Sequence, residues 1–131
     1  MFDPSTRVLV VDDMSTMRKI VAKVCRECGF TSIAEAADGK QAWEAVQQAQ
    51  PPFGLIISDW NMPNCSGLEF LKLVRADEKH KKTPFLLVTA EAEQTQVIEA
   101  VKAGVDQYVV KPFTVNDLKA KLEIVYKKYN K

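Results

Sequence analysis

The sequence has little of what marks disulfide-rich, zinc-binding or membrane proteins. Three cysteines in 131 residues favour free thiols in a reducing compartment over a disulfide framework, since the number is odd and the chain can form its own core. His80 is the only histidine, so a zinc site lacks ligands. No stretch approaches the ~20 apolar residues that cross a bilayer, and no apolar run follows the polar start of the chain. We therefore expect a cytoplasmic protein without a membrane partner.

An excess of charge of one sign is also missing. Lys and Arg number 18 against 17 Asp and Glu, a formal net charge of +1, and 47% of the residues are hydrophobic. Binding to a phosphate backbone usually requires a strong positive excess, so nucleic acid is a poor candidate partner. The length and composition are typical of one soluble globular domain, which we expect to span residues 1–131.

Short β-branched runs, each followed by a longer helical pattern, predict an α/β domain. The predicted strands are Arg7–Val11, Ser32–Ala36, Leu55–Ser58, Phe85–Thr89 and Gln107–Val110. Several of these runs are apolar without alternation, which is typical of strands covered by helices on both faces. We therefore expect a doubly wound five-stranded parallel sheet with five helices. Ligands of such sheets bind beyond the carboxyl ends of the strands.

The clearest predicted helix covers Ser15–Cys28, with Ser15 as its N-cap and Gly29 as its stop signal. Its apolar residues recur at helical spacing and predict one buried stripe, made of Met17, Ile20, Val21, Val24, Cys25 and Cys28. The last helix repeats the pattern with Leu118, Leu122, Val125, Tyr126 and Tyr129.

Chemically active residues stand at the ends of four predicted strands. Asp12 and Asp13 follow the first, Asp59 the third and Lys111 the fifth, while Thr89 ends the fourth. Three carboxylates at one rim repel one another, and a hard divalent cation, naturally Mg²⁺, would relieve that repulsion. With the Lys111 ammonium and the Thr89 hydroxyl, it would complete a pocket for a phosphoryl group and leave Asp59 as the nucleophile. One Asp alone would be read as a helix cap, but capping does not explain the whole set.

At these residues the sequence resembles the receiver domain of bacterial response regulators. The motifs are Val10-Val11-Asp12-Asp13, Ser58-Asp59-Trp60-Asn61-Met62-Pro63, Val88-Thr89-Ala90 and Val109-Val110-Lys111-Pro112-Phe113. The resemblance covers essentially the whole chain, and Met14-Ser15-Thr16-Met17-Arg18 and Thr89-Ala90-Glu91-Ala92 bring it closer to the single-domain chemotaxis regulators. It implies a flavodoxin-like fold with strand order 2-1-3-4-5, the order known for chemotaxis receivers.

The resemblance implies that Asp59 accepts a phosphoryl group from a phosphohistidine of a chemotaxis histidine kinase, or from a small acyl phosphate. Mg²⁺ would be held by Asp13, by Asp59 and by the Asn61 main-chain carbonyl, with Asp12 acting mainly through water. Such a domain catalyses its own phosphorylation and dephosphorylation but serves as a signalling switch in a two-component system. We expect a monomer.

The switch residues follow from the same resemblance. Lys111 would bind one phosphoryl oxygen, Thr89 would move to form a hydrogen bond with another, and Tyr108 would then turn inward. The reason is that the charged phosphoryl group stabilises the conformation in which hydrogen-bond donors lie closer to it. The Lys111–Pro112 peptide bond is expected to be cis. Asn61 and Glu91 occupy positions that tune the attack of water on the acyl phosphate. This pair predicts a short-lived phosphorylated state and is compatible with a phosphatase partner.

The output surface of the family lies on the fourth helix, the fifth strand and the fifth helix. Candidate residues on it are Ala92, Val97, Val101, Tyr108, Phe113 and Lys121, and its expected partner is the flagellar motor switch. The sequence departs from many receivers at Cys65-Ser66, where an acidic residue often precedes the glycine.

Three other functions are weighed against this one. An aspartate-nucleophile phosphatase needs a second carboxylate where Asn61 stands, and an FMN binder needs hydroxyl and glycine residues in the first loop, which here begins with two carboxylates. The third, a phosphate sink or adaptor that does not contact the motor, carries the same site residues and stays open.

Five further residues carry no catalytic or binding role in this interpretation. Cys25 and Cys28 have redox-like spacing but lie near a helix end in its apolar stripe, which predicts inert, packed thiols. His80 stands in a charged segment and is predicted to be solvated. Trp43 is expected to be partly packed, and Trp60, beside Asp59, should report metal and phosphoryl binding by fluorescence.

Overall fold

The computed structural model describes residues 2–90, 94–111 and 113–129. Its strands are β1 (Arg7–Val11), β2 (Ser32–Ala36), β3 (Leu55–Asp59), β4 (Phe85–Thr89) and β5 (Gln107–Val110). Its helices are α1 (Ser15–Glu27), α2 (Gly39–Gln48), α3 (Gly67–Ala76), α4 (Gln94–Ala103) and α5 (Val115–Tyr129). All neighbouring strands pair in parallel in the order β2-β1-β3-β4-β5, which confirms the predicted fold class and strand order.

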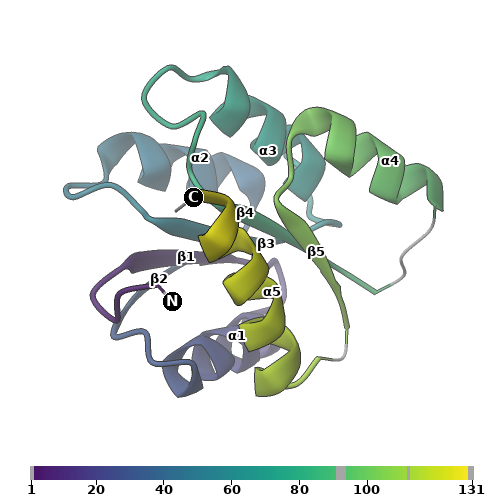
Figure 1. The fold of residues 1–131 in the computed structure, drawn as a ribbon. Coiled ribbons are helices and arrows are strands. Elements are labelled where there is room, and N and C mark those ends of the chain that lie inside the picture. The colour runs from purple at the N-terminus through teal and green to yellow at the C-terminus, as the bar shows by residue number, and fades with distance from the viewer. Residues whose placement is uncertain (1, 91–93, 112, 130–131) are drawn as a thin grey trace.

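Helices cover both faces of the sheet (Figure 1), with α1 and α5 on one face and α2, α3 and α4 on the other. Strand β1 shows why its apolar run does not alternate: Val8 and Val10 pack into the core beneath α1 and α5, whereas Leu9 and Val11 pack into the core on the opposite face. Both faces of a central parallel strand must be apolar for this reason. None of the helices in the described segments is long and apolar enough to cross a membrane.

Helix α1 begins at Ser15 and stops before Gly29, as predicted, but its N-cap is a different residue. Gly29 has φ 105°, and the N–H groups of Gly29 and Phe30 donate to the carbonyls of Arg26 and Cys25, which closes the last turn. The predicted N-cap at Ser15 is wrong, because Met14 holds that position and makes no side-chain cap bond. The predicted buried stripe is wrong at Ile20, whose side chain is 49% exposed. The helix buries Val21 and Cys25, as predicted, and also Ala22, which the predicted stripe did not include.

Helices α2 and α3 both begin at a polar N-cap residue, Asp38 for α2 and Ser66 for α3. Asp38 accepts from Gln41 N and caps α2. The turn residues of Asp38–Lys40 predict a loop, but the helix already begins at Gly39. Ser66 and Glu69 form a reciprocal capping box at the start of α3. Ser66 therefore supplies a helix cap where many receivers carry an acidic residue.

His80 is buried, contrary to the prediction of a solvated residue, and only 9% of it is exposed. The turns after α3 fold back toward α2, so the ring of Trp43 packs edge-on against His80 at 6.2 Å between centroids. His80 Nδ1 lies 3.2 Å from Asp77 Oδ1. Charge in the neighbouring sequence misled the prediction, because His80 points inward while its lysine neighbours are exposed.

Candidate functional site

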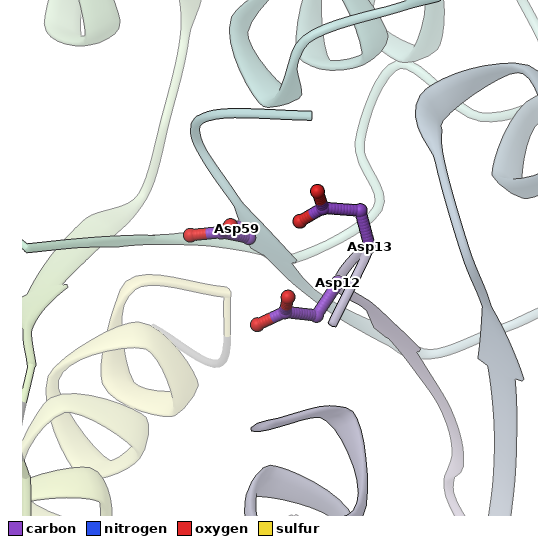
Figure 2. Close-up of side chains that lie close together, drawn as sticks. All are labelled: Asp12, Asp13 and Asp59. Carbon is purple, nitrogen blue, oxygen red and sulfur yellow. The ribbon is translucent and has the colours of Figure 1, made fainter. Parts of the chain in front are cut away.

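The three predicted carboxylates gather at the carboxyl ends of β1 and β3 (Figure 2). Val11 of β1 pairs with Ser58 of β3, so the residues that follow them, Asp12 and Asp59, lie side by side. One ligand oxygen from each of Asp12, Asp13 and Asp59 lies within 4.8 Å of the others. Asp12 is 2% exposed, Asp59 is half-buried and Asp13 is exposed, so the cluster opens toward solvent at Asp13. This acidic cluster could hold a metal ion.

Lys111 brings a cation to the same cluster from the end of β5. Its Nζ lies 3.2 Å from Asp12 Oδ2 and 3.1 Å from Asp59 Oδ1. Lys111 N donates to Thr89 O at 2.8 Å, which fixes the lysine main chain beside β4. Lys111, which follows a strand far from β1 in the sequence, thus offsets part of the negative charge of the three carboxylates.

The pKa values of this cluster are shifted by burial and by charge. Burial raises the pKa of Asp59; the nearby Lys111 ammonium lowers it, but the negative charge of Asp12 raises it again, and the pKa of Asp59 stays above its ordinary value. Burial alone would lower the pKa of Lys111, but the charges of Asp59 and Asp12 outweigh it, so the pKa of Lys111 is raised. A further cation beside Asp59 would offset both the burial and the repulsion from Asp12.

Sequence reasoning missed Arg18, which supports the first acidic loop. Its Nη1 donates to Asp12 O at 2.9 Å and its Nε to Glu35 Oε1 at 3.0 Å. Asp12 Oδ1 in turn accepts from Met14 N at 2.9 Å. Arg18 stands in the motif Met14-Ser15-Thr16-Met17-Arg18, but no local pattern predicts this role, because its partner Glu35 on β2 is brought beside it only by strand pairing.

Thr89 ends β4, as predicted, and its side chain is 6% exposed. Its strand partner is Val110, the residue before Lys111, so Thr89 and Lys111 share the rim where Asp59 stands. Trp60 is buried at 9% exposure directly after Asp59, and Asn61 is exposed. The structure thus brings together Asp12, Asp13, Asp59, Thr89 and Lys111 at one end of the sheet.

Tyr108 lies on β5, half-buried, with Lys121 Nζ 5.2 Å from the centre of its ring. Glu91 and Ala92 lie outside the described residues, and so does Pro112, on which the expected cis peptide bond falls. Tyr108, Phe113 and Lys121 line a groove of about 410 Å³ between β5 and α5. Val101 on α4 is 62% exposed and Val97 half-buried, and Ile98 and Val110, which the prediction did not include, are also exposed.

The two cysteines with redox-like spacing are packed thiols. Cys25 and Cys28 are both free. Burial is the main cause that raises the pKa of Cys25, to about 12, and it also raises the pKa of Cys28. A reactive thiol requires the opposite shift, so this pair agrees with the prediction of inert residues.

Comparison with known proteins agrees with this geometry. The model of the response regulator receiver domain matches residues 8–123. Chemotaxis protein CheY of Pseudomonas aeruginosa is 48% identical over 124 residues, covering 95% of this chain and 98% of the relative. Chemotaxis protein CheY-3 of Vibrio cholerae is 45% identical over 122 residues, covering 93% of this chain and 92% of the relative.

Solved structures show the same similarity. Vibrio cholerae CheY4, crystallised at low pH, superimposes with a TM-score of 0.84 at 36% identity, covering 92% of this chain and 98% of its own. A receiver domain protein from Clostridium thermocellum, at 22% identity and a TM-score of 0.82, shares the fold. The chain belongs to the response regulator receiver domain family. Within that family it is of the CheY type found in chemotaxis.

Proposed function

We propose that this receiver is switched by transfer of a phosphoryl group to Asp59, from a phosphohistidine of a chemotaxis histidine kinase or from a small acyl phosphate. The observation that carries the proposal is the group of three carboxylates with the Lys111 ammonium 3.1 Å from Asp59. Helix caps need no such convergence of charge. A nucleophile, a cation binding set and a phosphate-binding lysine are what phosphoryl transfer to a carboxylate requires.

The donor set fits Mg²⁺, which prefers carboxylate and carbonyl oxygens. We assign Asp13, Asp59 and the Asn61 main-chain carbonyl as its ligands, with Asp12 acting mainly through water. When bound, Mg²⁺ would stabilise the negative charge on the oxygens of the phosphoryl group during transfer. The buried Asp12 carboxylate is already engaged by Met14 N and Lys111, which suits an indirect role.

The chain's own residues would carry the transfer in one displacement. A carboxylate oxygen of Asp59 attacks the phosphorus, the bond from phosphorus to the donor nitrogen or oxygen breaks, and the donor leaves with the electron pair. Lys111 then exchanges its contact with Asp59 for a phosphoryl oxygen, and the Thr89 hydroxyl donates to another. Tyr108 turns inward from its half-buried position on β5, which changes the surface beside Lys121.

The signal would be reset by hydrolysis of the acyl phosphate. Water attacks the phosphorus and inorganic phosphate leaves, which restores the Asp59 carboxylate. We assign Asn61 and Glu91 to the positions that tune this step, by orienting the water or a phosphatase side chain. Both are polar, and a polar pair shields the phosphoryl group less than a bulky apolar pair would.

The output would be binding of the flagellar motor switch to the face made by α4, β5 and α5. The exposed apolar residues Ile98, Val101 and Val110 on that face support a protein partner. We further propose that residues 1–131 act in the cytoplasm as a single monomeric receiver domain, without nucleic acid or membrane partners. The near-neutral charge and the free cysteines support this.

The decisive experiment is the intact mass of the protein after incubation with acetyl phosphate. The wild type should gain one phosphoryl group when Mg²⁺ is present, and none when Mg²⁺ is chelated or when Asp59 is replaced in Asp59→Asn. A gain that survives in Asp59→Asn would contradict the assignment of the acceptor. Binding of a motor-switch peptide to the phosphorylated form separates a motor regulator from a phosphate sink, which would take up phosphate without binding.

A further inference from the structure

The loop between β3 and α3, residues 60–66, is closed tightly at its base. Gly67 N donates to Trp60 O at 2.8 Å. A Cβ at Gly67 would overlap the main-chain oxygen of Asp59, so only glycine allows this close approach. The loop carries Asn61, whose carbonyl we assign to the metal.

The far side of the same loop is bonded to the start of α2. Asn64 Nδ2 donates to Asp38 Oδ2 at 3.0 Å, while Asp38 Oδ1 accepts from Gln41 N at 2.8 Å. The main chain adds a second link, because Gly39 N donates to Cys65 O at 3.2 Å. A Cβ at Gly39 would lie 2.5 Å from that oxygen, so the two segments are in close contact.

The side-chain bond between the two segments is strong for its kind. Asp38 is 8% exposed, and its pKa is lowered, first by the bond from Gln41 N and then by the bond from Asn64. It therefore bonds as a carboxylate, and bonds to an ionised acceptor are stronger than neutral ones. Asn64 holds the left-handed conformation with φ 67°, which places its amide at this partner and is uncommon for residues other than glycine.

We propose that Asp38 and Asn64 are positioning residues for the metal site: their hydrogen bond holds residues 60–66 in the arrangement that lets the Asn61 carbonyl join Asp13 and Asp59 around Mg²⁺. The inference rests on the proposed function. Neither residue belongs to the acidic cluster, so both act through the loop. Removing such outer partners typically weakens metal binding by about 10- to 100-fold.

The capping role of Asp38 can be separated from its positioning role. A helix cap needs one oxygen, and a serine supplies it. Asp38 uses its second oxygen on Asn64, and the shorter serine side chain has no second acceptor for it. Asp38→Ser therefore keeps the cap of α2 and loses the link, while Asn64→Gly loses the link and keeps a residue suited to positive φ.

The test is Mg²⁺ titration of these variants, followed by Trp60 fluorescence in a Trp43→Phe background. Each single variant should raise the Mg²⁺ dissociation constant about tenfold. The double variant should raise it no further than one single variant does, because both changes remove the same bond. In the metal-free protein, exchange of the main-chain amides of residues 61–66 other than Pro63 should be faster in both variants, which reports on the loop without any metal.

Asp77→Ser is the matched control. Asp77 also accepts from a main-chain N–H, Lys79 N at 2.8 Å, and contacts a side chain, His80 Nδ1 at 3.2 Å, but it follows α3 at the opposite end of the sheet from Asp59. Its replacement should leave the Mg²⁺ dissociation constant unchanged.

Two results would overturn the positioning role while the wild type still binds Mg²⁺. One is an unchanged Mg²⁺ affinity in Asp38→Ser and Asn64→Gly, and the other is an equal loss in Asp77→Ser, which would indicate general destabilisation. A wild-type protein that neither binds Mg²⁺ nor takes up a phosphoryl group would contradict the proposed function itself, and the positioning role with it.

Discussion

At the scale of single residues, Lys111 decides the charge balance of the site. Its ammonium lies between Asp12 and Asp59, where it occupies space that a metal or a phosphoryl oxygen would compete for. Lys111→Met should bind Mg²⁺ a few times more tightly, since a competing cation is gone, but take up phosphoryl groups from acetyl phosphate roughly a hundredfold more slowly, as expected for loss of one charge-stabilising donor.

Both effects of Lys111→Met can be measured, by Trp60 fluorescence for Mg²⁺ and by intact mass against time for phosphoryl uptake. Lys119→Met, on the exposed surface of α5, is the control and should match the wild type in both. An undiminished rate of uptake in Lys111→Met would contradict the role assigned to the ammonium.

Cys25 predicts how stability depends on alkaline pH. Its pKa is raised from 9.0 to about 12 in the folded protein, chiefly by burial. Because the folded state keeps the proton that the unfolded state loses, the stability from Cys25 is fully present below pH 9 and falls as pH rises toward 12. The slope is about 1.4 kcal/mol per pH unit.

The effect of Cys25 is measured by urea unfolding of wild type and Cys25→Ala at several pH values above 9. The difference in free energy of unfolding between the two should shrink as pH rises, whatever the other titrating groups do. Cys28→Ala, at a half-buried thiol, should show a smaller change. Parallel curves for wild type and Cys25→Ala would show that the thiol does not titrate in this way.

At the scale of helices and strands, Asp106 joins three elements at the end of the sheet away from the acidic cluster. Its buried carboxylate accepts from Phe85 N at 2.8 Å and lies 3.0 Å from Arg75 Nη2 of α3 and 2.7 Å from Lys128 Nζ of α5. Asp106→Ala leaves these donors unpaired and should lower the free energy of unfolding by about 3–5 kcal/mol. Mg²⁺ affinity should not change, because the site lies at the other end.

Two neighbouring lysines on α5 test how much of the loss of unfolding free energy comes from burial of the acceptor carboxylate. Lys128 bonds the buried Asp106, whereas Lys127 bonds the exposed Glu123 at 3.3 Å. Lys128→Met should be clearly more destabilising than Lys127→Met, for which an exposed pair predicts less than about 0.5 kcal/mol. Equal values in thermal or urea unfolding would contradict the importance assigned to the Asp106 network.

The capping box of α3 gives a second prediction at this scale. Ser66→Ala should lower the free energy of unfolding by about 1 kcal/mol, since Glu69 N loses its acceptor. Ser66→Asp, which restores the acidic residue common in receivers, should keep the cap and the stability. Urea unfolding of the two variants tests this, and equal losses in both would exclude capping as the reason for the serine.

At the scale of the whole molecule, Mg²⁺ binding should stabilise the fold, because the ligand set exists only when β1 and β3 are paired. A Mg²⁺ concentration about 100 times the dissociation constant should add about 2.7 kcal/mol to the free energy of unfolding. Asp13→Asn should lose most of this gain. Thermal unfolding with and without Mg²⁺ measures it, and an unchanged Tm in the wild type would contradict a metal site.

Much of the fold could be predicted because it depends on local pattern. Unalternating apolar runs give the strands and their burial on both faces, and glycine gives the end of α1 at Gly29. The N-cap of α1 and the burial of Ile20 were predicted wrongly, since both depend on which residues the tertiary structure brings beside the helix. Burial of His80 likewise depends on where Trp43 lies, which no pattern in residues 77–83 records.

The amino-acid sequence alone determined which residues stand at the strand ends, and so placed Asp12, Asp13, Asp59, Thr89 and Lys111 at one rim. The reason is that the apolar pattern of each strand is local in the sequence, and that the carboxyl ends of parallel strands lie at the same edge of the sheet. Only the tertiary structure decided the pairings, such as Lys111 with Asp12 and Asp38 with Asn64. Such contacts depend on the crossover of helices between strands, which brings together side chains that are 99 and 26 residues apart.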